Sequence, residues 1–304
     1  MAAPRAVRVR CPAKINLGLW ILGKRSDGYH EIDTILQSVT LEDEILLEES
    51  RAGFILETRG IPIPEGAPNI IERAWSLISE SRKPASGVHA RLTKRIPVDA
   101  GLGGGSSDAA GFLLGVNRLL ALDFTESEIQ SIAERLGSDV PFFLKGGTAR
   151  ATGRGEQVRH LCPMPPTWVV LATPPLAIST SWAYGKVRIA LTLRAGGASM
   201  LAAAIEGKDW PSIASGLHND FEDVVLTEFE VVAGLRHALD ESGVLGSLLS
   251  GSGSTVFGLA RTEDEAQSAA RSVTALGATV HVVRTTERGV ALAGLSQRDD
   301  RLRR

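Results

Sequence analysis

The first half of the chain mixes segments with a period of two and segments with helical spacing. We predict strands, from β-branched residues and apolar–polar alternation, at residues 5–21, 41–49, 54–59 and 88–96. We predict helices, from apolar residues spaced three and four apart, at residues 69–81, 106–120 and 126–136. The strands at 41–49 and 54–59 are expected to pair across a turn at 51–53.

A proline cluster at residues 162–166 separates the two halves, because proline stops both helices and strand pairing. After it, the patterns predict strands at 168–173, 246–249, 255–260 and 279–283 and helices at 228–241 and 264–276. The alternation indicates the α+β class. We therefore predict an N-terminal domain at 1–162, a C-terminal domain at 163–290 and a charged tail at 291–304.

Composition places the chain among ordinary globular proteins. Its 304 residues are 43% apolar and 22% charged, so a sizeable core is expected and disorder is not. A net charge of −2 gives no support to nucleic-acid binding. The sequence has no run of about 18 apolar residues and no apolar leader, and Cys11 and Cys162 lie far apart. These features predict a cytoplasmic protein that neither crosses nor binds a membrane.

The strongest local signal is a glycine-rich loop at 101–105 that leads into Ser106, Ser107 and a predicted helix. Glycines let the backbone approach a ligand closely, and a helix N-terminus offers unpaired N–H groups, so the segment is typical of a phosphate cradle. No lysine follows the glycines, which excludes a Walker A loop. The alternative is a tight turn capped by serine. A second loop at 250–254 is either another anion site or a plain turn.

Two polar segments could supply catalytic groups. Lys14 and Asn16 share one face of an apolar strand, where a lysine needs a carboxylate or phosphate partner unless it reaches solvent at a sheet edge. Asp139 lies between a predicted helix and an apolar stretch that we expect to be a strand. Its carboxylate could pair with Lys14 and accept a proton from an alcohol, or it could be a simple turn residue.

An aromatic pair, Tyr29 and His30, follows the turn signal of Asp27 and Gly28. Such a pair could stack on a base and hydrogen-bond to it, or it could belong to an ordinary surface loop.

Together, these motifs resemble the GHMP kinases, which share an early Pro-Ala-Lys-Ile-Asn-Leu, a central Gly-Leu-Gly-Gly-Gly-Ser-Ser and a late Ser-Gly-Ser-Gly-Ser. The resemblance covers about residues 8 to 285. It implies a ribosomal protein S5 domain 2-like N-terminal domain, a ferredoxin-like C-terminal domain, and ATP and Mg²⁺ in a site between them.

Segments 12–17, 27–31, 137–143 and 219–222 are most similar to one branch of this family. That branch phosphorylates the 2-hydroxyl of cytidine-diphosphate methylerythritol in the non-mevalonate isoprenoid pathway. The alternatives are a kinase of homoserine or mevalonate, and a non-catalytic S5-like binding module. The metal ligands stay open, as does the choice between monomer and homodimer.

The resemblance also implies site residues. It makes Lys14 and Asp139 catalytic and assigns substrate binding to Asn16, Tyr29, His30 and Thr180. It assigns ATP binding to Asn69, Lys94, Pro97, Gly101, Leu102, Gly103, Gly104, Gly105, Ser106 and Ser107. Asp99, an acid beside the glycines, is expected to be exposed and non-catalytic.

Overall fold

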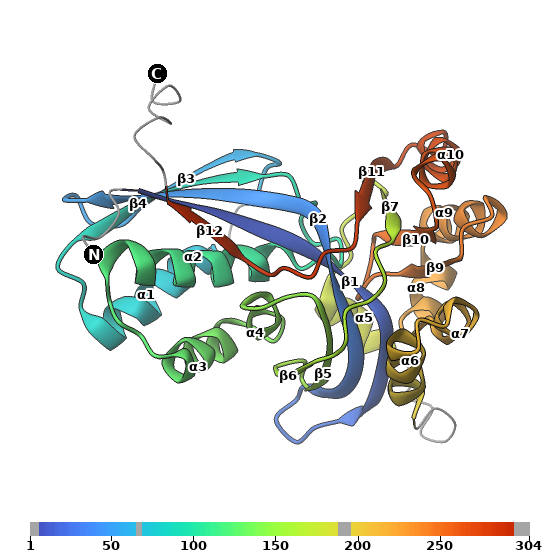
Figure 1. The fold of residues 1–304 in the computed structure, drawn as a ribbon, viewed down its shortest axis with the longest axis horizontal. Helices are drawn as coiled ribbons and strands as arrows, with labels where there is room; N and C mark the ends of the chain where they lie inside the picture. The colour runs from blue at the N-terminus through green and yellow to red at the C-terminus, as the bar shows by residue number, and fades with distance from the viewer. Residues whose placement is uncertain (1–5, 65–68, 188–195, 295–304) are drawn as a thin grey trace.

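The computed structural model describes residues 6–64, 69–187 and 196–294 and contains both strands and helices in each half of the chain (Figure 1). The strands are β1 (Ala6–Lys24), β2 (His30–Ser50), β3 (Ile55–Gly60), β4 (Gly87–Lys94), β5 (Thr148–Gly153), β6 (Gln157–His160), β7 (Trp168–Thr173), β8 (His218–Asn219), β9 (Gly246–Leu249), β10 (Val256–Ala260), β11 (Thr279–Arg284) and β12 (Ala291–Gly294). The helices are α1 (Ile70–Arg82), α2 (Gly104–Leu120), α3 (Glu126–Leu136), α4 (Val140–Phe143), α5 (Thr180–Lys186), α6 (Gly197–Glu206), α7 (Trp210–Gly216), α8 (Glu222–Glu228), α9 (Glu230–Glu241) and α10 (Glu263–Thr274). The predicted α+β class is confirmed.

The first sheet is built around β1 and β2, which pair antiparallel over nearly their whole length. Among the described residues its main path runs β12-β1-β2-β4-β3, with β5, β6 and β8 attached beside it. The predicted hairpin of 41–49 with 54–59 is wrong, because β4 lies between β2 and β3 and pairs parallel with β3. A parallel pair needs a long crossover, which α1 supplies, and local periodicity does not reveal such a pairing.

Helix α2 lies very close to this sheet. A Cβ on Gly111 would come within 2.4 Å of Cys11 Sγ, and one on Gly115 within 2.4 Å of Leu47 Cδ1. These glycines therefore let the helix axis approach the strands. The close packing fixes the N-terminus of α2 beside β1.

The second sheet is four-stranded among the described residues, antiparallel throughout, with the order β11-β7-β10-β9. Its chain order, a strand, helices, two strands, a helix and a strand, is the ferredoxin-like pattern that the family resemblance implied. Alternate residues of β7 face opposite ways: Val170 and Ala172 pack with α9 and α10, and Val169 and Leu171 pack with residues of β1 and β2.

The C-terminal part of the chain returns to the first sheet. Residues 291–294, which we predicted as the start of a charged tail, form β12 and pair antiparallel with β1, so the tail prediction is wrong for them; residues 295–304 of that tail lie outside the described residues. β8 also pairs with β1, in parallel. β12 and β8 therefore pair with the edge of β1 that does not pair with β2. The boundary at 162/163 stays a prediction.

Candidate active site

A cleft of ≈ 1130 Å³ lies along β1 between the loop before α2 and helix α5. Most of the predicted site residues line it: Lys14, Asn16, Tyr29, His30, Asn69, Lys94, Pro97, Gly101, Gly103, Gly104, Gly105, Ser106, Asp139 and Thr180. Leu102 and Ser107 do not, because the Leu102 side chain is buried in the apolar core between the two sheets and Ser107 is fully buried in α2. The assignment of both residues to ATP binding stays a prediction, and the Leu102 carbonyl accepts a hydrogen bond from the Lys14 N–H (3.0 Å).

Lys14 lies at the floor of the cleft and is 4% exposed. Its Nζ donates to Asn16 Oδ1 (2.6 Å) and to the Gly101 carbonyl (2.8 Å), and it lies 3.7 Å from Asp139 Oδ2. Burial lowers the pKa of Lys14, and the neighbouring Asp139 opposes that shift. The predicted shared face of Lys14 and Asn16 is confirmed, and Lys14 does not reach solvent at a sheet edge.

Asp139 immediately precedes α4 and not a strand, so the predicted strand after it is wrong. The stretch Val140–Phe143 is wholly buried on all sides, and periodicity cannot separate a buried strand from a buried helical turn. Pro141 in the first turn favours the helix because its fixed φ suits that position. The Asp139 side chain is 35% exposed, so its carboxylate is open to the cleft.

The glycine loop continues directly into α2. The helix begins at Gly104, two residues earlier than predicted, and Gly103 at φ 69° is its N-cap. No side chain caps this helix, which excludes the capped-turn alternative for the serines. The uncapped N–H groups of the first turn and the positive end of the helix dipole favour an anion.

The second glycine loop packs against the first. Ser250 Oγ donates to the Gly101 carbonyl (2.9 Å), and the Thr255 N–H donates to the Ala100 carbonyl (3.1 Å). Thr180, at the start of α5, contacts Ser252 through their hydroxyls (3.1 Å). This loop therefore braces the first one and connects it to α5.

Lys94 belongs to a buried cluster with Asp43 and Asp108. Its Nζ donates to both carboxylates, at 2.8 Å for Asp108 Oδ2. Burial raises the pKa of Asp108 to about 8, although Lys94 opposes the shift. Asp108 Oδ1 and Ser107 Oγ, in the first turns of α2, are buried without a hydrogen-bond partner. Sequence reasoning missed Asp43 and Asp108, which only the fold brings together.

Asn69 has a structural role as well as a place in the cleft wall. Its Oδ1 accepts the Ile71 N–H (3.0 Å), and the Glu72 carboxylate accepts the Asn69 N–H in return (2.8 Å). This capping box starts α1. Asp99 is exposed, as predicted, with a positive φ of 51°.

Aromatic rings gather at the other end of the cleft. His30 stacks on Tyr184 with ring centroids 4.6 Å apart, and Tyr184 meets Phe221 edge to face at 4.9 Å. Burial, and then the charge of Asp139, raise the pKa of Tyr184. Sequence reasoning missed Tyr184. Its spacing of four residues from Thr180 on α5 places both on one helix face and could have found it.

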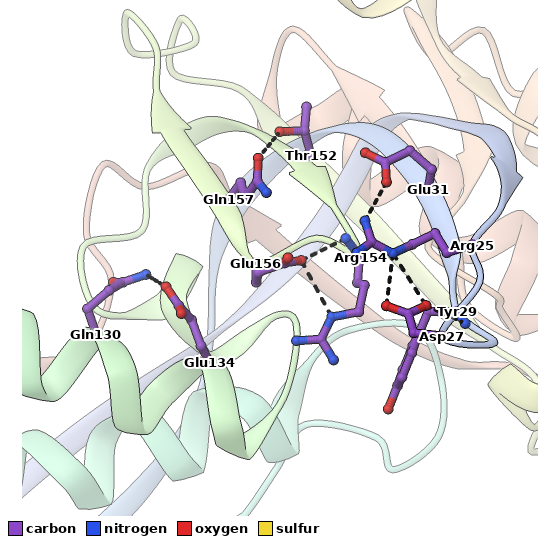
Figure 2. Close-up of polar contacts among 10 residues, drawn as sticks. All are labelled: Arg25, Asp27, Tyr29, Glu31, Gln130, Glu134, Thr152, Arg154, Glu156 and Gln157. Carbon is purple, nitrogen blue, oxygen red and sulfur yellow. Dashed lines mark hydrogen bonds and ion pairs between the residues drawn. The ribbon is translucent and has the colours of Figure 1, made fainter.

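Tyr29 is exposed on a tightly bound loop (Figure 2). Its N–H donates to Asp27 Oδ1 (3.1 Å), and its carbonyl accepts the Arg25 N–H (2.8 Å). The Arg25 guanidinium binds the carboxylates of Asp27 and Glu31. The ring is thus held at the mouth of the cleft without being buried.

Two features are absent from the residues that the structure describes. No helix in that part of the chain is long and apolar enough to cross a membrane. No group of three or more histidine, cysteine, aspartate or glutamate residues in the described ranges could hold a metal ion.

Models of known families match both halves of the chain. The GHMP kinases N terminal domain matches residues 69–147, and the GHMP kinases C terminal domain matches residues 200–279. Among solved structures, a 4-(cytidine 5'-diphospho)-2C-methyl-D-erythritol kinase is 34% identical with a TM-score of 0.75, covering 91% of this chain and 98% of its own. A homoserine kinase from Cytophaga hutchinsonii has a TM-score of 0.78 over 96% of this chain and 99% of its own, but at 20% identity it shows the fold alone.

Relatives with higher identity carry the name of the first of these two enzymes. The 4-diphosphocytidyl-2-C-methyl-D-erythritol kinase of Synechococcus sp. (strain JA-3-3Ab) is 45% identical over 86% of this chain and 87% of the relative. That of Pelotomaculum thermopropionicum is 43% identical, covering 85% of this chain and 91% of the relative. The chain belongs to the 4-diphosphocytidyl-2-C-methyl-D-erythritol kinase family within the GHMP kinases.

Proposed function

We propose that this chain transfers the terminal phosphoryl group of ATP to the 2-hydroxyl of 4-(cytidine 5'-diphospho)-2-C-methyl-D-erythritol, in the non-mevalonate isoprenoid pathway and in the cytoplasm. The observation that carries this proposal is the order of groups along one cleft. The glycine loop and the start of α2 lie at one end, the aromatic rings lie at the other, and Lys14 and Asp139 lie between them.

Each part of this order is supported by a contact. Lys14 bridges the glycine loop and Asp139, since it donates to the Gly101 carbonyl and pairs with the carboxylate. Asp139 in turn lies close enough to Tyr184 to raise the pKa of the phenol. With the nucleotide phosphates at the start of α2 and the base among the rings, the terminal phosphate and the substrate hydroxyl would therefore meet at Asp139.

Asp139 accepts or orients the proton of the attacking hydroxyl in this proposal. Its carboxylate is open to the cleft, and Lys14 Nζ lies 3.7 Å from Asp139 Oδ2. Lys14 also offsets negative charge on the phosphoryl group in transfer, which depends on positioning and charge more than on covalent chemistry.

The residues at the start of α2 fit a nucleotide with its magnesium ion. A Cβ on Gly105 would meet only Ile70 Cγ2 at 3.8 Å, so phosphate oxygens can approach the backbone there. Ser107 Oγ and Asp108 Oδ1 are buried oxygens without a hydrogen-bond partner at the start of α2, and these are the residues that would hold Mg²⁺. When bound, Mg²⁺ neutralises phosphate charge.

A coupled ADP-release assay with Mg-ATP tests the function. The cytidine substrate, homoserine and mevalonate are compared, with Asp139→Asn as the inactive control. We expect turnover of the cytidine substrate alone. Turnover of another alcohol in its place would contradict the substrate, and no turnover by a folded, ATP-binding protein would contradict the kinase.

A further inference from the structure

An arginine lies between the aromatic end of the cleft and Asp139. Arg154 is in the turn between β5 and β6, and its side chain lines the cleft and is 28% exposed. Its guanidinium carbon is 4.8 Å from the centroid of the Tyr29 ring, and Figure 2 shows the two groups next to each other. The next residue, Gly155, packs on the catalytic segment: a Cβ there would lie 3.8 Å from Asp139 Oδ1.

Hydrogen bonds to backbone groups fix the turn that carries Arg154. The Glu156 carboxylate accepts the Arg154 backbone N–H (2.7 Å), and the Gly155 N–H donates to the Thr152 carbonyl (3.1 Å). The same Glu156 oxygen is 3.8 Å from Arg154 Nε, which is an ion pair beyond hydrogen-bond distance. The guanidinium therefore keeps donors that can turn to a ligand in the cleft.

Arg154 differs from the other cations of the cleft in how its charged group is held. Among the described residues that line the cleft, the cations are Lys14, Lys24, Lys94 and Arg154. Lys14 is bound by Asn16, Gly101 and Asp139, and Lys94 is bound by Asp43 and Asp108. Lys24 is exposed at the end of β1. Arg154, by contrast, is fixed by the hydrogen bond of its backbone to Glu156 and by its contact with the Tyr29 ring.

The proposed substrate places a diphosphate where this cation lies. Its two phosphates join the cytidine to the methylerythritol, so with the base at the rings and the hydroxyl at Asp139 they span the distance between Tyr29 and Asp139. Arginine presents a planar fork of donors that matches phosphate oxygens. We propose that Arg154 binds the diphosphate of the cytidine substrate and so sets the preference for a nucleoside-diphosphate-linked alcohol, an inference that rests on the proposed function.

Binding of cytidine 5'-diphosphate and of cytidine, measured by calorimetry, tests the contact. Both probes carry the base, but only one carries phosphates. In Arg154→Gln we expect affinity for the diphosphate to fall about 10- to 100-fold, the effect of losing hydrogen bonds to a charged group. Cytidine affinity should fall less than about fivefold, because only the cation–π contact with Tyr29 is lost. Arg159→Gln is the matched control and should change neither value, because Arg159 is exposed on β6 and lies outside the cleft lining.

Kinetics give a second readout. In Arg154→Gln, KM for the cytidine substrate should rise about 10- to 100-fold, and kcat should stay within about threefold, as for a group that binds substrate and transition state equally. KM for ATP should not change, and Arg154→Lys should restore part of the loss.

The outcomes separate the two proposals. If wild type turns over the cytidine substrate and Arg154→Gln keeps the same ratio of diphosphate to cytidine affinity, the role of Arg154 is overturned and the proposed function stands. Equal losses for both probes would make Arg154 a support for Tyr29 only, which also overturns it. If wild type neither binds the diphosphate nor turns over the substrate, both proposals fail.

Discussion

At the scale of single residues, the central interaction of the site is the ion pair of Lys14 with Asp139. A buried lysine is costly unless acceptors surround it, and Lys14 has the Asn16 amide oxygen, the Gly101 carbonyl and the Asp139 carboxylate around its ammonium. Two of these acceptors are neutral and fixed by the backbone or by Thr34, which binds Asn16 (2.9 Å). Only Asp139 is free to act on a ligand in the cleft.

Replacing Asp139 by asparagine keeps the shape and removes the base. We expect kcat to fall by about 10²–10⁴, the usual contribution of a general base. The melting temperature should fall, because buried Lys14 loses its charged partner and keeps two neutral acceptors. ADP release and circular dichroism measure the two effects, with Asp264→Asn on the exposed start of α10 as control. A loss of less than about threefold in folded protein would remove the catalytic role.

Asp108 makes folding stability depend on pH. Its pKa is raised from 3.8 to about 8 in the folded protein, mainly by burial and also by Asp43, against the opposing charge of Lys94. A raised pKa means that the folded state binds the proton more tightly. Its contribution to stability is therefore full below about pH 4 and is lost as the pH rises through about 8.

The Asp108→Asn variant, which cannot titrate, should remove this dependence. In wild type, the free energy of unfolding should decline between pH 5 and 7 by up to about 1.4 kcal/mol per pH unit from this group. The variant should show a flatter profile over the same window. Urea unfolding at several pH values gives both curves, and parallel curves would rule out a proton held at Asp108.

At the scale of elements, the two glycine loops form one packed unit, and Gly101 is where they touch. It has a φ of 77°, and a Cβ on it would come within 1.9 Å of the Ser250 carbonyl oxygen. Gly105, in the first turn of α2, serves as a comparison for Gly101, because a Cβ on Gly105 would clash with nothing. Gly101 is therefore required for the packing of the two loops, whereas Gly105 is not required for it.

Gly101→Ala should destabilise the fold by about 1–2 kcal/mol from the left-handed backbone alone, and further from the clash with Ser250. Gly105→Ala should leave stability unchanged or raise it by about 0.5–1 kcal/mol, because alanine suits a helix better than glycine. Chemical denaturation of both variants measures the difference. Equal stability of the two would contradict the packing of the loops.

The elements also show what the sequence can predict. The helices at 69–81, 106–120 and 126–136 are confirmed to within two residues, because their apolar spacing is local. The partner of β3 could not be found from its own pattern, since β4 reaches it only through the crossover of α1. The site shows the same limit. Motifs located Lys14, Asp139 and the glycine loop, but the cluster of Asp43 with Asp108 depends on tertiary contacts.

At the scale of the whole molecule, β1 connects all parts of the interior. Val9 and Cys11 pack in the core under α2, Ile15 and Leu17 pack in the core between the two sheets, and Ile21 packs in the core with α9 and α10. β12 and β8 add to it strands from the distant end of the chain. Neither half can therefore unfold without exposing apolar residues of β1 that the other half covers.

This arrangement predicts one cooperative unfolding transition. Trp75 on α1 stacks on Phe54 at 5.5 Å, and Trp182 on α5 meets Phe229 at 5.0 Å, so each reports on one half. In variants that keep only one of these tryptophans, with phenylalanine at the others, the urea midpoint from fluorescence should coincide with that from far-UV circular dichroism. The comparison is made within each variant, so a general loss of stability does not affect it. If Trp75 and Trp182 instead reported midpoints that lie on opposite sides of the circular-dichroism midpoint, the halves would unfold separately and the cleft between them would open without loss of either core.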